Sequence, residues 1–272
     1  MVLTGAGLST ASGIPAYRDA LGAWRHPPPI QHQSFLRSEA TRRRYWARSY
    51  YGWQTMANAT PNTGHLALAL LQARGVVATI ITQNVDGLHQ RAGADPVIEL
   101  HGSVHQVTCL GCHARFSRAL VQEWLVGHNP ELAHREPCPI TVAPDGDAQI
   151  EDEITDAFAV PHCPECAGVL KPDVVFFGDN VPRDRVERAC DAVHQANTLL
   201  VVGSSLTVFS GFRFARLAHE LGKPVVAINR GVTRADALLT LKIDADCGET
   251  LQALARGLTT GDGPGATAGP SI

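Results

Sequence analysis

The chain has 272 residues, of which 44% are hydrophobic, and a formal net charge of −3. This length and apolar content predict a globular protein with one large core or two smaller ones. The slightly acidic balance argues against nucleic acid as a partner, and no run reaches the roughly 20 apolar residues that cross a bilayer. The first residues enter a strand pattern without a leader-like segment, so we expect a soluble, cytoplasmic protein.

Apolar, β-rich runs recur along the chain, and each of them ends in small or polar residues. Helix-like segments lie between several of these runs, for example 65–74, closed by Gly75, and 211–221, closed by Gly222. The alternation predicts an α/β fold around a parallel sheet. The runs lie at 2–7, 76–84, 96–102, 199–205 and 224–231.

In a parallel sheet the ligand site lies outside the carboxyl ends of the strands. The unusual polar clusters of this chain all follow apolar runs, so we expect them to line one crevice. The clusters are Gly5-Ala6-Gly7, Gln83-Asn84-Val85-Asp86, His101-Gly102, Gly203-Ser204-Ser205 and Asn229-Arg230-Gly231.

Two regions interrupt the alternation, one rich in arginine and aromatic residues and one bearing cysteines. We predict that both are insertions that form a smaller domain. The acidic segment 144–156 in the second insertion is expected to be a solvated loop or a frayed helix. The glycine-rich tail 259–272 is predicted to be disordered. The predicted domains are a larger one (1–30, 62–103 and 171–258) and a smaller one (31–61 and 104–170).

Two cysteine pairs are the strongest metal signal. Cys109 and Cys112 form one pair with a spacing of three residues, and Cys163 and Cys166 form the other. Four thiolates close a tetrahedral zinc site with no open position, so the predicted zinc is structural. Buried thiols or a redox dithiol remain the alternative. Cys138 lies between the pairs and is expected to be a free cysteine.

The opening motif Gly5-Ala6-Gly7 begins like a dinucleotide fingerprint, in which glycines let the backbone approach a pyrophosphate. Thr10 stands where a third glycine is expected, so an ordinary strand-to-helix turn is an equal alternative. The loop 12–19 follows, with Tyr17 and Arg18, and resembles a segment that covers a cofactor.

Polar side chains at three later strand ends are further candidates. Asn84 and Asp86 are two residues apart and are suited to one pocket, although an Asx turn is the alternative. His101 is a candidate general base if it is not simply a core histidine. Gly203 to Ser205 offer donors for phosphate or an N-cap, and Asn229 to Gly231 suit a ribose or a turn.

These motifs together resemble the sirtuin family, in the same order and over nearly the whole chain. They are GAGLSTASGIPAYR, TQNVDGLH, the histidine of ELHG, the two CxxC pairs, KPDVVFFGD and VGSS. The details are most similar to class II sirtuins: Tyr17, PIQHQSFLRS, RRRYWARS and the APDGD segment before the second cysteine pair.

The resemblance implies an NAD-dependent protein lysine deacylase that transfers the acyl group to ADP-ribose and releases nicotinamide. It implies a Rossmann-type larger domain for NAD, a smaller zinc-bearing domain, and acyl-lysine proteins as partners. His101 is then the base, and Asn84 and Asp86 serve the ribose and nicotinamide pocket. The implied NAD contacts are Gly5, Ala6, Gly7, Ser9, Gly13, Ile14, Pro15, Tyr17, Arg18, Gln83, Asn84, Val85, Asp86, Gly203, Ser204, Ser205, Asn229, Arg230, Gly231 and Cys247.

Tyr45 and Arg48 match a Tyr-x-x-Arg pair that reads the distal carboxylate in sirtuins favouring acidic acyl groups. We therefore hypothesise a preference for an acyl group larger than acetyl. The alternative is a helix face with ordinary packing and solvation.

Three other functions compete with this interpretation. An ADP-ribosyltransferase would use the same NAD site, and label transfer from NAD to protein would reveal it. A hydride-transferring dehydrogenase is disfavoured by the missing third glycine. A non-catalytic zinc-ribbon module is disfavoured by the acidic balance and by His101.

Overall fold

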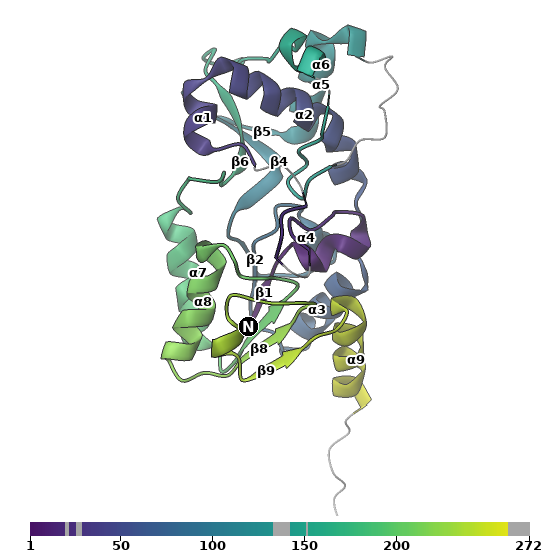
Figure 1. The fold of residues 1–272 in the computed structure, drawn as a ribbon, viewed down its shortest axis with the longest axis vertical. Coiled ribbons are helices and arrows are strands. Elements are labelled where there is room, and N and C mark those ends of the chain that lie inside the picture. Colours follow the sequence, from purple (N-terminus) through teal and green to yellow (C-terminus); the bar gives the residue numbers. More distant parts are fainter. Residues whose placement is uncertain (20–21, 26–28, 133–141, 151, 261–272) are drawn as a thin grey trace, which may run out of the picture.

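The computed structural model describes residues 1–19, 22–25, 29–132, 142–150 and 152–260. The molecule is elongated in Figure 1, with a parallel sheet and its helices at one end and a small antiparallel sheet with further helices at the other. The predicted free Cys138 and residues 261–272 of the predicted tail lie outside the described residues, whereas Thr259 and Thr260, predicted to be disordered, are helical.

The larger sheet has six parallel strands in the order β3-β2-β1-β7-β8-β9. After the first strand the chain adds β2 and β3 on one side of it, and β7, β8 and β9 later extend the sheet on the other side. This change of direction creates a crevice beside β1, where ligands bind in such sheets. The strands are β1 (Val2–Thr4), β2 (Ile80–Thr82), β3 (Val97–Glu99), β7 (Leu199–Val202), β8 (Val225–Ile228) and β9 (Leu241–Ile243).

Helices cover both faces of this sheet because its strands are apolar on both sides. Leu3 packs with the core beneath α7 (Arg183–Gln195) and α8 (Phe209–Glu220). Its neighbour Val2 faces the opposite core, under α3 (Thr63–Ala73) and α9 (Cys247–Thr260). The two helix pairs flank the sheet in Figure 1.

Both predicted glycine stops are confirmed. Gly75 follows α3 with φ of 74°, and Gly222 follows α8 with φ of 68°. These angles lie in the left-handed region, which glycine enters without a Cβ clash and so ends a helix readily.

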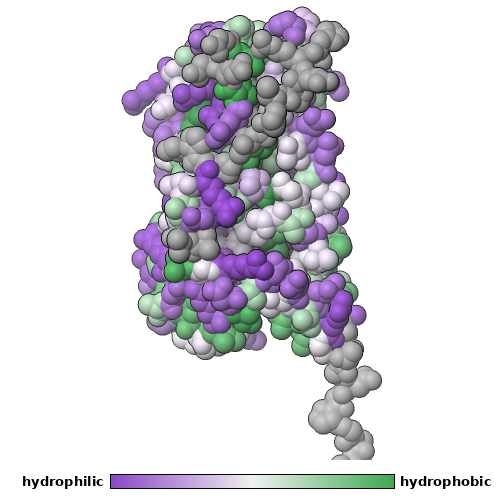
Figure 2. Space-filling model, turned by 45° about the vertical axis from the view of Figure 1, so that its right-hand side comes forward, coloured by the Kyte–Doolittle hydropathy of each residue, from purple (hydrophilic) through white to green (hydrophobic). Residues whose placement is uncertain are grey.

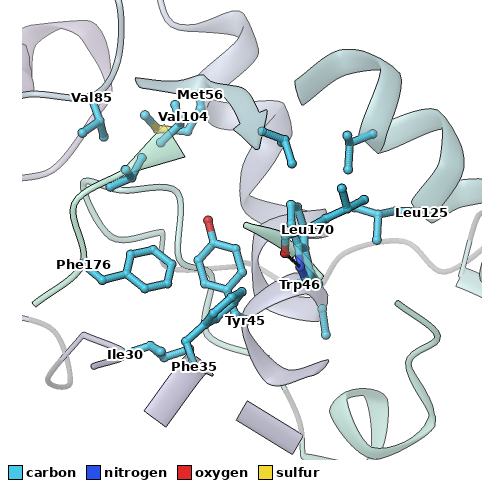
Figure 3. Close-up of a cluster of buried hydrophobic side chains, with 14 of the residues drawn as sticks. Ile30, Phe35, Tyr45, Trp46, Met56, Val85, Val104, Leu125, Leu170 and Phe176 are labelled. Carbon is cyan, nitrogen blue, oxygen red and sulfur yellow. Dashed lines mark hydrogen bonds between the residues drawn. The ribbon is translucent and has the colours of Figure 1, made fainter. Parts of the chain in front are cut away.

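The smaller sheet is antiparallel, in the order β5-β4-β6, and helices from both predicted insertions pack against it. Its core contains Phe35, Trp46, Leu125 and Leu170, and the Trp46 indole Nε1 donates to the Leu170 carbonyl oxygen over 3.3 Å (Figure 3). The strands are β4 (Gly102–Cys109), β5 (Arg115–Ser117) and β6 (Leu170–Val174). The helices are α1 (His32–Arg37), α2 (Glu39–Asn58), α5 (Arg118–His128) and α6 (Asp152–Ala157).

The remaining elements are short: η1 (Ala6–Ser12), α4 (Leu88–Arg91), η2 (Pro130–Leu132) and η3 (Asp236–Leu238). None of the helices in the described part of the chain is both long and apolar enough to span a membrane. On the face shown in Figure 2, the hydrophobic side chains among the coloured residues lie in separate small groups.

Candidate active site

The first and fourth predicted clusters touch each other at the centre of the sheet edge. The Gly7 amide donates to the Gly203 carbonyl oxygen over 2.8 Å. A Cβ on Gly7 would lie 2.8 Å from that oxygen, and a Cβ on Gly203 would collide with the Leu8 backbone. Gly203 also has φ of 59°. Glycine is therefore required at both positions, because only it permits this approach of two backbones.

A cavity of about 830 Å³ opens above this contact, at the carboxyl edge of the parallel sheet. It brings together residues from all five predicted clusters. The predicted cofactor residues that line it are Gly5, Ala6, Gly7, Ser9, Ile14, Tyr17, Arg18, Gln83, Asn84, Val85, Asp86, Gly203, Ser204, Ser205, Asn229, Arg230 and Cys247. Gly13, Pro15 and Gly231 do not line it, although each adjoins a residue that does.

Asn84, Asp86 and Ser9 form a buried hydrogen-bonded group on the cavity floor. The Asn84 amide donates to the Ser9 hydroxyl oxygen (3.0 Å) and to the Gly5 carbonyl oxygen (3.1 Å). The Ser9 hydroxyl donates to one Asp86 carboxylate oxygen over 2.7 Å, and the other oxygen accepts from the Leu88 amide over 3.0 Å. Asp86 thus makes the turn-type hydrogen bond of the alternative interpretation and still lines the cavity.

Two histidines that the sequence analysis missed lie behind this group. The His65 Nε2 is 3.5 Å from the Ser9 hydroxyl, and the His89 Nε2 is 2.9 Å from the Thr4 hydroxyl. Burial lowers the pKa of His65 to about 4 and that of His89 to about 3. Both rings are therefore neutral near pH 7 and serve as hydrogen-bonding parts of the core.

His101 follows β3 and lines the cavity. Its Nδ1 lies 2.9 Å from the Gln83 carbonyl oxygen, and its Nε2 lies 2.8 Å from the Ser210 hydroxyl. Burial lowers the pKa of His101, and Arg185 lowers it further, while the hydrogen bond to Gln83 acts in the opposite direction. A neutral imidazole is the form that accepts a proton.

Tyr17, in the loop 12–19 that the sequence predicts as a cover, belongs to an aromatic group that lines the cavity. Tyr17, Trp24 and Phe177 contact one another, with ring centroids 5.9 to 6.2 Å apart. The Arg18 guanidinium lies 4.0 Å from the centre of the Trp24 ring, a cation–π distance. The four side chains all line the cavity.

Gln83, Ser204 and Cys247 shape the part of the cavity near β7 and β8. The Gln83 amide donates to the Ser204 hydroxyl oxygen over 2.8 Å, and that oxygen also accepts from the Leu206 amide over 3.2 Å. The Cys247 thiol lies 3.5 Å from the Ile228 carbonyl oxygen. Ser204 therefore links two strand-end loops and accepts within a turn; the N-capping alternative is wrong, because the N-cap of α8 is Val208 and receives no side-chain hydrogen bond.

The opposite wall carries Tyr45 and two carboxylates, Asp145 and Asp147. Tyr45 packs against Phe35 and Phe176, with centroids 5.6 and 5.2 Å apart (Figure 3). Burial raises the pKa of the Tyr45 hydroxyl, so the phenol stays protonated.

Arg48 lies behind this wall and does not line the cavity. Its Nε is 2.7 Å from an Asp147 carboxylate oxygen and donates to the Ala148 carbonyl oxygen over 2.8 Å. Burial and the neighbouring Asp145 raise the pKa of Asp147 to about 7. The expectation of a solvated acidic loop is wrong here, because Asp145 and Asp147 are only partly accessible and face the cavity instead.

The four paired cysteines converge at the tip of the smaller sheet. Their sulfur atoms all lie within 4.8 Å of one another, with Cys109 and Cys166 at 3.5 Å and Cys112 and Cys163 at 3.7 Å. Bonds of about 2.3 Å to a tetrahedral zinc would place sulfurs about 3.8 Å apart. The donor set therefore fits a structural zinc, and it lies apart from the cavity lining.

Several cavity residues were not found from the sequence: Asp145, Asp147, Phe176, Phe177 and Ser210. The phenylalanines belong to the KPDVVFFGD motif, which was quoted but given no role. The two carboxylates belong to the APDGD segment of the resemblance, whereas Ser210 has no local signal, because it meets His101 only through the packing of distant segments.

A model of the Sir2 family matches residues 5–210. An NAD-dependent protein deacetylase of Xanthomonas campestris is 52% identical over 250 residues, covering 92% of this chain and 84% of the relative. One of Bordetella bronchiseptica is 50% identical over 250 residues, covering 92% of this chain and 90% of the relative.

Solved structures agree with the sequence relatives. A Sir2 structure with a p53 peptide and NAD⁺ has a TM-score of 0.72 and 30% identity, covering 95% of this chain and 92% of that one. A Sir2 structure bound to a propionylated peptide has a TM-score of 0.70 and 29% identity, with the same coverage. The strand-end cavity, the four-cysteine site and these matches together establish that the chain belongs to the Sir2 family.

Proposed function

We propose that this protein is an NAD-dependent protein lysine deacylase whose active site is the cavity at the carboxyl edge of the parallel sheet. The observation that carries the proposal is that His101, Asn84 and Asp86 line one cavity together with both glycine loops. A candidate base, a buried amide and carboxylate, and close backbone approaches for a dinucleotide are thus available in one place.

NAD serves as an electrophile in this reaction, because nicotinamide leaves C1′ of the ribose and the acyl oxygen takes its place. His101 would draw the proton from a ribose hydroxyl, which then attacks the acyl carbon. The ring is suited to this role because it is neutral near pH 7 and borders the cavity. The lysine amine leaves the acyl carbon and one water molecule adds to what remains, so the products are the free lysine, nicotinamide and O-acyl-ADP-ribose.

Asn84 and Asp86 would hold the ribose and nicotinamide. The Ser9 hydroxyl accepts a hydrogen bond from Asn84 and donates one to Asp86, so this one hydroxyl fixes the orientation of both side chains. A group that is already hydrogen-bonded in its working orientation needs little reorganisation when substrate binds.

Acyl-lysine proteins are the proposed partners. The similar solved structures include Sir2 bound to an acetylated peptide and to a propionylated peptide. Tyr45 lines the cavity, and an acyl group larger than acetyl would extend toward it. Recognition of an acidic acyl group by Arg48 would require the guanidinium to leave Asp147, its present partner.

Three finer points stay predictions: the class II assignment, the domain boundaries, and a cytoplasmic location. A reducing compartment would suit the four thiolate ligands of the proposed zinc.

The test is nicotinamide release from NAD with acetyl-, succinyl-, glutaryl- and long-chain acyl-lysine peptides, for the native protein and His101→Ala. We expect peptide-dependent release that the substitution reduces at least about 100-fold, the usual contribution of a general base. Incorporation of label from NAD into protein, without O-acyl-ADP-ribose, would instead indicate an ADP-ribosyltransferase. The absence of release with every peptide would overturn the proposal.

A further inference from the structure

The hydrogen bonds of His101 define which of its nitrogens is protonated. The Gln83 carbonyl oxygen can only accept, so Nδ1 at 2.9 Å carries the hydrogen. In the neutral ring Nε2 then has the lone pair, and the Ser210 hydroxyl at 2.8 Å must donate to it. His101 is thus held from both sides, and the nitrogen able to accept a proton is the one that faces Ser210.

The position of Ser210 depends on close packing at the start of α8. Ser210 is the second residue of this helix, and Gly211 follows it. A Cβ on Gly211 would overlap the side chain of Gln83. The helix start therefore lies against the loop after β2, so that Gln83 and Ser210 contact the same imidazole from two elements. Both His101 and Ser210 line the cavity.

We propose that Ser210 is a positioning residue for the deacylation reaction, holding the His101 ring and its Nε2 lone pair in the orientation that receives the substrate proton. The proposal rests on the function proposed above.

The hydroxyl suits this role because it can exchange donor and acceptor roles. Before proton transfer Ser210 donates to Nε2, and the ribose hydroxyl must displace it from the single lone pair. When the ribose proton has moved to Nε2, the ring is a cation with two N–H groups. Nδ1–H still donates to the Gln83 carbonyl, and Nε2–H donates to the Ser210 oxygen after a rotation about the Cβ–Oγ bond.

The cation has few other sources of stabilisation. In the described part of the chain, the hydrogen-bond partners of the His101 ring are Gln83 and Ser210, and neither is a carboxylate. Arg185 disfavours the protonated ring. A hydrogen bond from a charged donor is stronger than a neutral one, so the Ser210 contact should favour the protonated ring over the neutral ring.

The test compares Ser210→Ala, Ser210→Thr and the control Arg216→Gln in steady-state kinetics with NAD and an acetyl-lysine peptide. Arg216 lies on the same helix, but its side chain is 51% exposed and outside the cavity. We expect Ser210→Ala to lower kcat about 5- to 10-fold, the equivalent of one hydrogen bond, with the KM for NAD within about twofold. Ser210→Thr, which keeps the hydroxyl, should restore kcat to within about twofold of the native value, and Arg216→Gln should change neither constant.

A spectroscopic measurement makes the test independent of turnover. In protein labelled with ¹⁵N-histidine, the His101 signals are identified by their loss in His101→Ala. We expect Nδ1 to be the protonated nitrogen of the neutral ring in the native protein. Ser210→Ala should move the Nε2 signal and lower the pH at which His101 titrates.

Unchanged kcat and unchanged His101 signals in Ser210→Ala would overturn the proposal. If the native protein releases no nicotinamide, the proposed function fails, while the ¹⁵N signals still report whether Ser210 holds Nε2. Should Ser210→Ala lose its fold, Ser210→Cys carries the same test, because a thiol is a weaker donor than a hydroxyl.

Discussion

At the carboxyl edge of the parallel sheet, several functional residues closely follow the strands that place them, whereas the opposite wall of the cavity is assembled from distant segments. Asn84 is the second residue after β2, and His101 is the second residue after β3. Arg48, by contrast, meets Ala148 across 100 residues of sequence. The first kind of site can be predicted from strand patterns, and the second cannot.

The two walls also differ in electrostatics. On the sheet edge the carboxylate of Asp86 is satisfied by a hydroxyl and an amide. On the opposite wall Asp145 and Asp147 share a partly buried position with one close guanidinium, and burial raises the pKa of both. The sheet edge thus holds its side chains in fixed orientations. On the opposite wall, the charge of the two carboxylates changes when they bind a proton or when a substrate comes close.

The largest effect is expected where the smaller sheet depends on metal. Cys163→Ser removes one ligand of the four-cysteine site, so bound zinc should fall from about one ion per chain to none and the melting temperature by about 10 °C. Metal analysis and thermal unfolding measure both. Cys190→Ser, a half-buried cysteine outside the site, should change neither. Full zinc content in Cys163→Ser would show that the thiolate is not a ligand.

A substitution at the sheet edge should damage both stability and cofactor use. In Gly203→Ala a Cβ would collide with the Leu8 backbone at a left-handed residue, which alone costs about 1 to 2 kcal/mol. We expect a larger loss of unfolding free energy and at least a tenfold rise in the KM for NAD. Gly222→Ala is the matched control, because Gly222 also has a left-handed φ but an added Cβ would have no other atom within 4 Å. Equal effects at both glycines would refute the role of the Gly7–Gly203 contact.

The buried histidines predict the response to acid. His89 has a pKa of about 3 when folded, against 6.5 for its ordinary value, so protons bind the unfolded chain more readily. Its contribution to stability is complete above about pH 6.5 and declines as the pH falls toward 3, by about 2 to 3 kcal/mol at pH 4.5. Denaturant unfolding at pH 7.5 and 4.5 measures the loss of unfolding free energy between the two pH values. We expect this loss to be smaller in His89→Gln than in the native chain by the same amount. The exposed His194→Asn should retain the native sensitivity.

The smallest effect concerns the opposite wall. Asp147→Asn removes the countercharge of Arg48, so turnover of succinyl- and glutaryl-peptides relative to acetyl-peptide should rise about fivefold, the size of one charge-assisted contact. The exposed Asp156→Asn is the control. An unchanged ratio of acyl preferences would mean that Arg48 does not reach the acyl group and would weaken the hypothesis of carboxylate recognition.

The sequence by itself determined the α/β alternation, the positions of the strand ends and the pairing of the cysteines into one metal site. Each of these depends on local chemistry: apolar runs form buried strands, glycine permits left-handed caps and close backbone contacts, and a spacing of three residues directs two thiolates at one ion. Because parallel strands end at the same edge, residues that follow different strands meet without further information.

The tertiary structure decided which side chains complete the site. Ser210 reaches His101 across 109 residues because Gly211 lets α8 pack against Gln83, and no pattern around Ser210 announces this. Asp147 faces the cavity, although its segment reads as a solvated acidic loop, because Arg48 lies beside it. Such contacts depend on the relative positions of packed elements, which long-range burial determines and which a single local stretch of sequence does not encode.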